Sequence, residues 1–235
     1  MQQRRHRAES HGQLARRARL RQFRRAGLTR YRCDRPMPLG VNLMSLTKVL
    51  RCAKDDDMRT LKAVDEEDVT NLVYEAKNPD RIAEYDMKLM DIDADTLTIP
   101  VTEYDARVTL PTSEFTRILR DLSQLDESLR IKVSKEGVWF ASDGEAANGS
   151  VLFRQSDGGH VNEDDDSIPA GVVIMINQYV SLTFSLKYLV NFSKSASLSG
   201  NVQMLMSNDV PLLIAYDFTQ GCIRYYLAPP KIGDD

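Results

Sequence analysis

The sequence predicts an α+β fold built on one strand–helix–strands unit that is used twice. After residue 36 the chain reads as short stretches with strand or helix period, and none of them is long. Two of these stretches recur about 140 residues further on. Residues 89–106, which lie between the copies, contain acids and a proline but no sustained period. We therefore expect two similar domains joined by a connector.

The repeat is visible in two pairs of segments. Residues 41–50 combine the start of a strand with a short helix that carries a cation, and residues 182–189 do the same. Residues 68–75 are echoed by residues 209–217, apart from a gap of one residue. A unit that recurs in this way predicts two domains of similar architecture.

A further helix and several strands are expected between the two copies. Thr112 or Ser113 can cap the first turn of this helix, and Glu114 suits the helix dipole. The apolar residues that follow have helical spacing: Phe115, Ile118, Leu119 and Leu122. Residues 129–133, 138–141 and 150–153 read as strands.

The residues whose side chains could take part in catalysis do not form an enzyme site. No glycine-rich phosphate loop with lysine and no Gly-x-Ser-x-Gly turn is present, and His160 lies in a polar loop. Asp91, Asp93 and Asp95 have the spacing of the first calcium ligands of an EF-hand, but the glycine and the glutamate of that motif are absent. We therefore expect no catalysis, no cofactor and no metal.

The cysteine spacing and the hydropathy of the chain indicate its redox compartment and whether it contacts a membrane. The three cysteines are far apart and fit no zinc pattern, which indicates a reducing compartment. No apolar run approaches the ~20 residues of a membrane helix, so we expect no membrane contact.

Two segments that lie far apart in the sequence have a similar mixture of apolar residues, tyrosine and proline. The first runs through residues 85–93 and 97–100, and the second combines residues 209–212 with residues 225–229. Both mix Leu, Ile or Met with Tyr and Pro in stretches too irregular for a helix. Apolar groups held on loops by proline tend to stay exposed, and exposed apolar patches mark binding surfaces. From about Tyr31 to Lys231 the chain resembles the proliferating-cell nuclear antigen family, the eukaryotic sliding clamps of DNA replication.

The resemblance implies a DNA-clamp fold, with repeated βαβββ units and short helices on one face of antiparallel sheets. It divides the chain into a remnant of the N-terminal clamp domain (29–88), the interdomain connector (89–106), the C-terminal clamp domain (107–230) and a tail (231–235). The C-terminal domain has both of its helices. The first domain is incomplete, because only its second half, from about residue 40 to residue 88, is recognisable.

Residues 1–28 form an Arg-rich segment that does not resemble the family. Residues 1–35 carry twelve arginines against Glu9 and Asp34, a balance of +10 in a chain whose net charge is −3. Codons for residues 11–19 can be chosen so that, read one base later, they encode a strand typical of the family. One interpretation is therefore a segment translated out of frame. The other is a genuine disordered basic arm that contacts phosphates. The transcript sequence decides between them.

The resemblance also implies a DNA-facing surface. In the family the short helices face the duplex, and their basic groups meet phosphates without reading sequence. Taken singly, each cation is more often part of a solvated helix face. The cations that match are Lys48, Arg51, Arg120, Lys187 and Lys194.

A partner-binding pocket is implied where the two apolar segments meet. Family members receive a short helical plug there from polymerases, ligases and nucleases. The connector supplies Leu97, Ile99 and Pro100, and the other wall contains Pro211, Tyr226, Leu227, Ala228 and Pro229. Ordinary packing at strand ends is the alternative interpretation of these residues.

Two further features follow from the resemblance. Subunits pair edge to edge, which places Cys52, Tyr85, Ser150 and Val151 at or near the seam. Lys135 matches the lysine to which ubiquitin or a relative is attached, although Trp139 departs from the lysine that is usual nearby.

We therefore expect a nuclear homotrimer that acts as a processivity factor for DNA polymerase and as a docking platform in replication and repair. Its partners are double-stranded DNA of any sequence, polymerase and other proteins with clamp-interacting peptides, and the clamp loader. The alternative is a truncated clamp fragment that binds partner peptides but does not form a ring around DNA.

Overall fold

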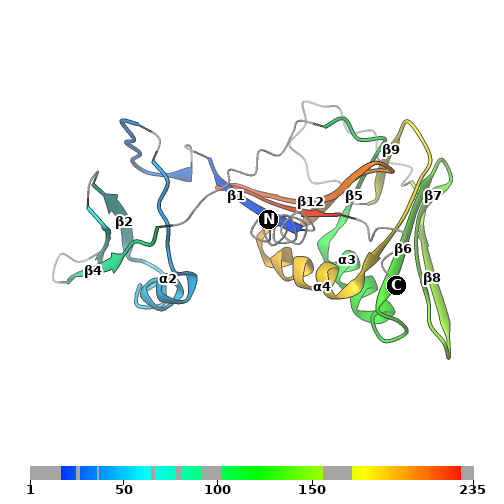
Figure 1. The fold of residues 1–235 in the computed structure, drawn as a ribbon, viewed down its shortest axis with the longest axis horizontal. Helices are drawn as coiled ribbons and strands as arrows, with labels where there is room; N and C mark the ends of the chain where they lie inside the picture. Colours follow the sequence, from blue (N-terminus) through cyan, green and yellow to red (C-terminus); the bar gives the residue numbers. More distant parts are fainter. Residues whose placement is uncertain are drawn as a thin grey trace, which may run out of the picture. The chain divides into compact units, whose positions relative to one another are not determined.

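The computed structural model describes residues 17–24, 27–35, 37–64, 67–77, 81–91, 102–155 and 171–228. The chain divides into two compact units (Figure 1). Unit 1 consists of residues 1–31 and 102–235, and unit 2 of residues 32–101.

Unit 1 contains two antiparallel sheets. The six-stranded sheet has the order β1-β13-β12-β11-β5-β9, and the four-stranded sheet has the order β10-β6-β7-β8. The strands are β1 (Arg17–Phe23), β5 (Ala106–Pro111), β6 (Ser128–Ser134), β7 (Gly137–Asp143), β8 (Asn148–Phe153), β9 (Val173–Ile176), β10 (Val180–Ser185), β11 (Asn201–Ser207), β12 (Val210–Phe218) and β13 (Gly221–Leu227).

Two strand–helix–strands motifs build these sheets, and each gives its first strand to the other. Motif A consists of β5, helix α3 (Thr112–Leu122) and strands β6–β8. Motif B consists of β10, helix α4 (Leu186–Ser193) and strands β11–β13. Strand β5 of motif A pairs with β11 of motif B, and β10 of motif B pairs with β6 of motif A. The exchange makes motifs A and B one folded body.

Helices α3 and α4 pack against each other on the side of the sheets that forms the core. In Figure 1 they lie side by side on one side of the six-stranded sheet. The apolar stripe expected for α3 is confirmed, because Phe115, Ile118, Leu119 and Leu122 are all buried. A short 3-10 helix, η2 (Lys194–Leu198), follows α4.

The expected side-chain cap of α3 is wrong. Pro111 occupies the N-cap position, and no side chain caps the first turn. Thr112 is buried instead, and its hydroxyl donates to the carbonyl oxygens of Ser199 and Gly200, at 2.9 and 3.1 Å. This threonine therefore joins α3 to the segment before β11, a partner 87 residues away in the sequence that local spacing does not reveal.

Among the described residues, unit 2 contains the helix and the three following strands of a single motif of the same kind, without its first strand. It contains α2 (Leu43–Leu50) and a three-stranded sheet of order β2-β3-β4, formed by β2 (Met58–Ala63), β3 (Val69–Glu75) and β4 (Ile82–Lys88). The Asn42 side chain caps α2 by accepting from the backbone N–H groups of Met44 and Ser45. Its core is small: Leu72, Tyr74 and Met87 are buried, with apolar residues of α2 packed partly against them.

Part of the Arg-rich segment is ordered, which corrects the expectation of a disordered head. Residues 17–23 form β1, which pairs with β13 along its whole length, from Arg17 opposite Leu227 to Phe23 opposite Gly221. An edge strand offers unpaired N–H and C=O groups to any extended chain, whatever its side chains. Residues 1–16 lie outside the described residues.

Candidate nucleic-acid and partner-binding surfaces

Three of the predicted DNA-binding cations lie on the helices of unit 1. Arg120 is in the last turn of α3, Lys187 is the second residue of α4, and Lys194 is the C-cap of α4. All three side chains are exposed. Because the apolar faces of α3 and α4 are buried, the cations lie on the solvent side of the paired helices.

Exposed polar neighbours hold two of these cations only weakly. The guanidinium of Arg120 lies 3.6 Å from the carboxylate of Asp121, and both side chains are more than half exposed. The Lys194 amine donates to the side-chain oxygen of Asn191 at 2.9 Å. Surface pairs of this kind contribute little to stability, so the cations can exchange them for phosphates at small cost.

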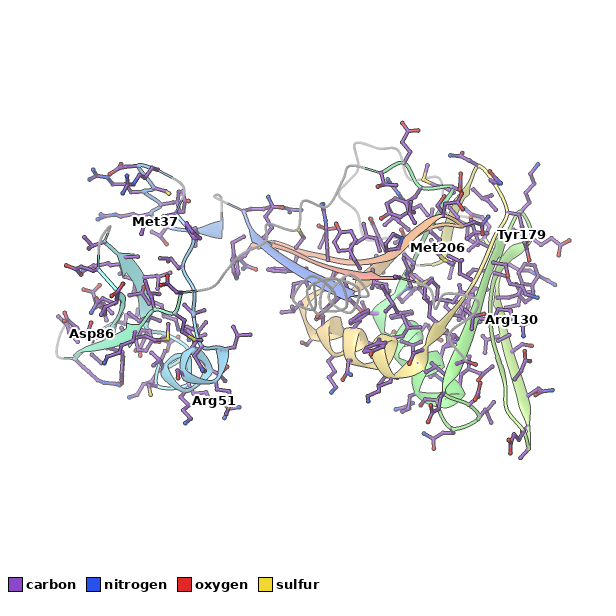
Figure 2. All side chains as sticks on the ribbon, in the orientation of Figure 1. Met37, Arg51, Asp86, Arg130, Tyr179 and Met206 are labelled. Atoms are coloured by element: carbon purple, nitrogen blue, oxygen red, sulfur yellow. The ribbon has the colours of Figure 1, made fainter. Side chains whose placement is uncertain are left out.

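The remaining two cations belong to unit 2. Lys48 lies in the last turn of α2, and Arg51, labelled in Figure 2, is its C-cap. Both are exposed. Cations at this end of a helix also interact favourably with the helix dipole, so a purely structural role accounts for their position equally well.

The structure describes part of one wall of the predicted partner pocket. Tyr226 and Ala228 are half-buried at the end of β13, and Pro211 is exposed in β12. Leu227 is only 4% exposed and belongs to the core of unit 1, as the packing interpretation predicts for this residue. The other predicted pocket residues, Leu97, Ile99, Pro100 and Pro229, lie outside the described residues.

Sequence reasoning missed Tyr104 at this wall. Burial raises the pKa of its phenol, the neighbouring Tyr226 raises it further, and Arg224 opposes the shift. Tyr104 therefore lies among residues of β13. The available signal was an aromatic residue shortly after Pro100, in the segment that was assigned to the connector.

The Arg-rich segment lies beside the same wall. In the ladder between β1 and β13, Ala18 is opposite Tyr226 and Arg17 is opposite Leu227. The strand next to the predicted pocket therefore comes from the segment that was expected to be disordered or out of frame.

The residues predicted at the subunit seam lie on or next to sheet edges. Strand β4 is an edge of the sheet in unit 2, and β8 is an edge of the four-stranded sheet in unit 1. Tyr85 is on β4, and its hydrogen bond with the Cys52 side chain, followed by burial, raises the pKa of its phenol. In β8, Ser150 is exposed and Val151 is half-buried against the core.

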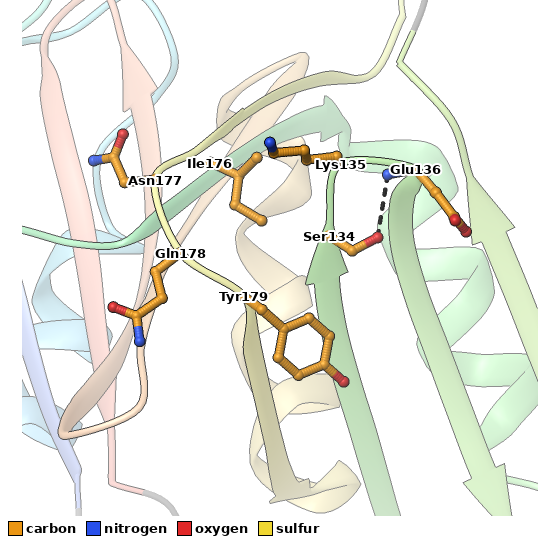
Figure 3. A pocket seen from close by; sticks show the side chains of 7 residues that line it. All are labelled: Ser134, Lys135, Glu136, Ile176, Asn177, Gln178 and Tyr179. Carbon is orange, nitrogen blue, oxygen red and sulfur yellow. Dashed lines mark hydrogen bonds between the residues drawn. The ribbon is translucent and has the colours of Figure 1, made fainter.

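Lys135 lies at the tip of the turn between β6 and β7. The turn depends on Gly137, which has a φ of 155° and whose added Cβ would lie 2.3 Å from the Phe153 carbonyl oxygen. Lys135 is exposed beside a hollow of about 290 Å³, which Ile176 and Tyr179 line from the opposite side (Figure 3). Trp139 is half-buried two residues after Gly137.

The described part of the chain offers little for metal or membrane chemistry. Among these residues, no three His, Cys, Asp or Glu side chains are grouped so that they could hold a metal ion. No helix found there has the length and apolarity to cross a bilayer. Of the acids in the calcium-like spacing, Asp91 alone is described, and His160 lies outside the described residues.

Unit 1 combines paired helices on antiparallel sheets with exchanged first strands and exposed helix cations, and the family matches identify the class of protein as a DNA sliding clamp. Two family models cover most of the chain. The one described as "Proliferating cell nuclear antigen, C-terminal domain" matches residues 98–231, and its N-terminal counterpart matches residues 17–97. A "Proliferating cell nuclear antigen" of Chaetomium thermophilum is 52% identical over 210 residues, which span 89% of this chain and 78% of that protein. The chain belongs to the proliferating cell nuclear antigen family.

The family match starts earlier than the resemblance that was drawn from the sequence. The N-terminal model begins at residue 17, the first residue of β1, and not near Tyr31. Strand β1 is therefore part of the matched region. The resemblance was placed too late because the arginines obscure the strand pattern.

Proposed function

We propose that this chain acts in the nucleus as a processivity factor for DNA polymerase and as a docking platform in replication and repair, without catalysis of its own. The observation that carries the proposal is the set of exposed cations on the solvent side of α3 and α4. Cations on a rigid helix pair contact phosphates of any sequence, which is what a protein that moves along DNA requires.

Retention on the duplex comes from ring closure in this proposal. Each interaction with a phosphate is weak and sensitive to salt. Among the described residues, β4 and β8 are sheet edges without a second neighbouring strand, so they are available for pairing between neighbouring subunits. Three chains would close the ring around DNA. A clamp loader would then be the partner that opens the ring.

Docking of partners is assigned to the wall around Tyr226. A half-buried tyrosine beside Tyr104, with Ala228 and Pro211 nearby in the sheet, offers an apolar surface with phenol groups at its rim. Such a surface suits a short amphipathic turn with aliphatic and aromatic anchors, as in clamp-interacting peptides. Lys135, exposed at the tip of its turn, is proposed as a site where ubiquitin or a relative is attached.

The contribution of the helix cations to DNA binding can be measured with substituted proteins. In an assembled ring, the double substitution Arg120→Ala and Lys194→Ala should reduce retention on circular DNA. It should also lower the slope of log K against log salt by roughly 0.9 for each phosphate that is no longer neutralised. Peptide binding should stay unchanged. The matched control is Arg107→Ala, because Arg107 is exposed between the buried Ala106 and Val108 and so lies on the sheet face away from the helices.

The outcome against the proposal is equally specific. Arg107→Ala removes one charge, whereas the helix pair removes two. The same loss of retention per charge in both variants would mean that bulk charge, and not the helix face, binds DNA. Residues 1–16 are deleted in both proteins, which removes four of the nine arginines of the Arg-rich segment and keeps β1. The five arginines that remain are the same in every variant, so they do not affect the comparison.

A second candidate is supported by the exposure of apolar residues in unit 2. This candidate is a clamp fragment that binds partner peptides but does not encircle DNA. Mass in solution separates the two, since a ring has three times the chain mass of 26.6 kDa.

A further inference from the structure

Unit 2 is a copy of motif B at a nearly constant distance along the chain. Helix α2 begins at Leu43 and α4 at Leu186, and 143 residues separate them. Strands β2 and β11 begin at Met58 and Asn201, which are also 143 residues apart. Both helices have eight residues and are followed by three antiparallel strands. Equivalent positions can therefore be compared one by one.

The comparison shows that an apolar surface buried in motif B is open in unit 2. Leu186 is 1% exposed, whereas its equivalent Leu43 is 71% exposed. Met204 is fully buried in β11, whereas its equivalent Leu61 in β2 is 60% exposed. Leu61 pairs with the buried Leu72, so it lies on the face of the sheet that α2 covers. Leu186 and Met204 belong to one core cluster in unit 1, so we expect their equivalents Leu43 and Leu61 to lie on one surface. An exposed apolar patch marks an interaction surface.

Unit 1 shows what covers the equivalent surface of motif B. Motif A places its first strand, β5, on the free edge of β11, and its helix α3 packs on α4. The arrangement is reciprocal, because β10 of motif B adds to β6 of motif A. The partner of one strand–helix–strands motif is therefore a second motif that exchanges first strands with it.

Unit 2 contains counterparts of both strands that motif B uses in this exchange. Neither counterpart makes the corresponding strand pair among the described residues. Within the described residues, β2 pairs with β3 alone, so its other edge is open. Residues 37–42 occupy the position of β10, 143 residues before Val180–Ser185, and they precede α2 as β10 precedes α4. They form no strand; the Met90 N–H donates to the Gly40 carbonyl oxygen at 2.9 Å, and Val41 packs partly against the core of unit 2. Its equivalent in β10, Phe184, is buried in the core of unit 1, so this packing is compatible with pairing of the segment as a strand.

We infer that unit 2 pairs with unit 2 of a second copy of this chain. Residues 37–42 of each copy add to the free edge of β2 in the other, and the two α2 helices pack together over Leu43 and Leu61. The contact is two-fold symmetric, so each copy gives and receives the same elements. It reproduces between identical motifs the exchange that unit 1 makes between motifs A and B.

The residues of segment 37–42 are compatible with a strand at the position that β10 has in motif B. Pro38 lacks an N–H, which normally excludes proline from a paired strand. Its equivalent is Ser181, whose N–H donates to the Asn208 side chain at 3.3 Å rather than to β6. A proline at this position therefore removes no bond from the ladder. Arg59, the equivalent of the buried Val202, is the exception, and its guanidinium is held by the Lys54 carbonyl oxygen at 2.9 Å.

The experiment follows amide hydrogen exchange of the full chain over a range of concentrations, together with mass by sedimentation equilibrium. The inference predicts protection of residues 37–42 and 58–63 that rises with concentration. It also predicts a doubling of mass, from one chain to two or from one ring of three chains to two rings. The substitutions Leu61→Asp and Leu43→Asp should abolish both signals. Leu43 is the first residue of α2, where an acid suits the helix dipole, so this variant keeps its helix.

The matched control is Met175→Asp. Met175 is 54% exposed, but it lies on β9 of unit 1, which belongs neither to the proposed contact nor to the edges β4 and β8. Its association should equal that of the parent. Unchanged protection of β3 and β12 in every variant shows that both units remain folded.

Three outcomes would overturn the inference. Protection of residues 58–63 that does not depend on concentration means that the surface is covered within one chain. Concentration-dependent protection that is confined to β4 and β8 means that only the ring interfaces form. This result would support the proposed clamp and contradict the proposed contact between two copies of unit 2. Association that survives both Leu43→Asp and Leu61→Asp means that a different surface is responsible.

Discussion

The hydroxyl groups of Ser195 and Tyr225 share a buried hydrogen bond of 2.7 Å. It joins η2, directly after helix α4, to β13, the strand that carries the proposed partner wall. The Tyr225 ring also stacks on Phe192 of α4, with ring centroids 4.4 Å apart. Helix and strand are thus held in one geometry by a few side chains.

Removal of this bond should destabilise unit 1. We expect Ser195→Ala to lower the free energy of unfolding by about 1–3 kcal/mol, because the Tyr225 hydroxyl loses this partner in a buried site. Urea denaturation followed by circular dichroism measures the loss. Ser113→Ala, at an exposed position of α3, should change it by no more than about 0.5 kcal/mol. Equal effects of the two variants would mean that the buried bond contributes nothing.

Tyr216 should make the fold sensitive to alkali. Burial, followed by Tyr225, raises the pKa of its phenol well above the ordinary value. A raised folded-state pKa gives stability that is complete below the unfolded pKa of about 10 and is lost as the pH rises through the folded-state value. We expect Tyr216→Phe to weaken the decline of stability above pH 10, as measured by urea denaturation at a series of pH values.

At neutral pH the same variant should not be destabilised. The Tyr216 hydroxyl is one of the buried side-chain groups without a hydrogen-bond partner among the described residues. Its removal eliminates a desolvation cost. Tyr179→Phe, at an exposed tyrosine, is the control and should leave the alkaline decline as it is in the parent. A clear loss of stability at pH 7 for Tyr216→Phe would show that the hydroxyl has a partner.

Substitution of Gly221 should release β1. A Cβ at this position would lie 2.1 Å from the Gln22 carbonyl oxygen, so the two strands could no longer meet there. We expect Gly221→Ala to increase hydrogen exchange in residues 17–23 while β11 stays protected. Thr219→Ala, in the exposed turn just before it, is the control. Unchanged exchange in residues 17–23 would mean that β1 is held by other interactions.

A substitution in the proposed partner wall should lower the affinity for peptide ligands. Tyr226→Ala should weaken binding of a clamp-interacting peptide by about 2 kcal/mol, on the order of thirtyfold, because aromatic anchors often carry most of the energy of an interface. Fluorescence anisotropy with a labelled peptide measures the change. Tyr179→Ala, in the turn before β10 and away from this wall, should bind normally. Parent-like affinity of the Tyr226 variant would place the peptide elsewhere.

The two units should differ in resistance to proteases at low protein concentration. Unit 1 has an extensive buried core, whereas unit 2 buries a small cluster around Tyr74 and leaves α2 without a buried residue. Local opening is easiest where little apolar packing opposes it. We expect the first cleavages in unit 2 and a resistant product that begins near residue 100. Equal resistance of residues 40–90 would contradict this expectation.

Local periodicity and the internal repeat were enough to predict some of the elements. The spacing of Phe115, Ile118, Leu119 and Leu122 located α3, and alternation located β6. The repeated segments located α2 and α4 at equivalent positions. These features depend on neighbours within a few residues, and the apolar period of a short segment records which of its faces is buried.

Interactions between distant segments could not be predicted in this way. Thr112 was expected to cap its own helix, but it is bonded to Ser199 and Gly200 instead. Tyr104 was not recognised as a neighbour of β13, because nothing in its own segment indicates which strand it meets.

The sequence by itself determined the family and the α+β class, because both depend on residue type and local spacing. The residues proposed to contact phosphates were chosen on the same grounds and stay a prediction. Tertiary structure alone decided that residues 17–23 complete an edge of the sheet next to Tyr226, and that Leu43 and Leu186 differ in exposure. The physical reason is that backbone pairing is indifferent to side-chain sequence, while burial of an apolar residue requires a second surface. Whether such a surface is present depends on how the whole chain folds and not on the residue itself.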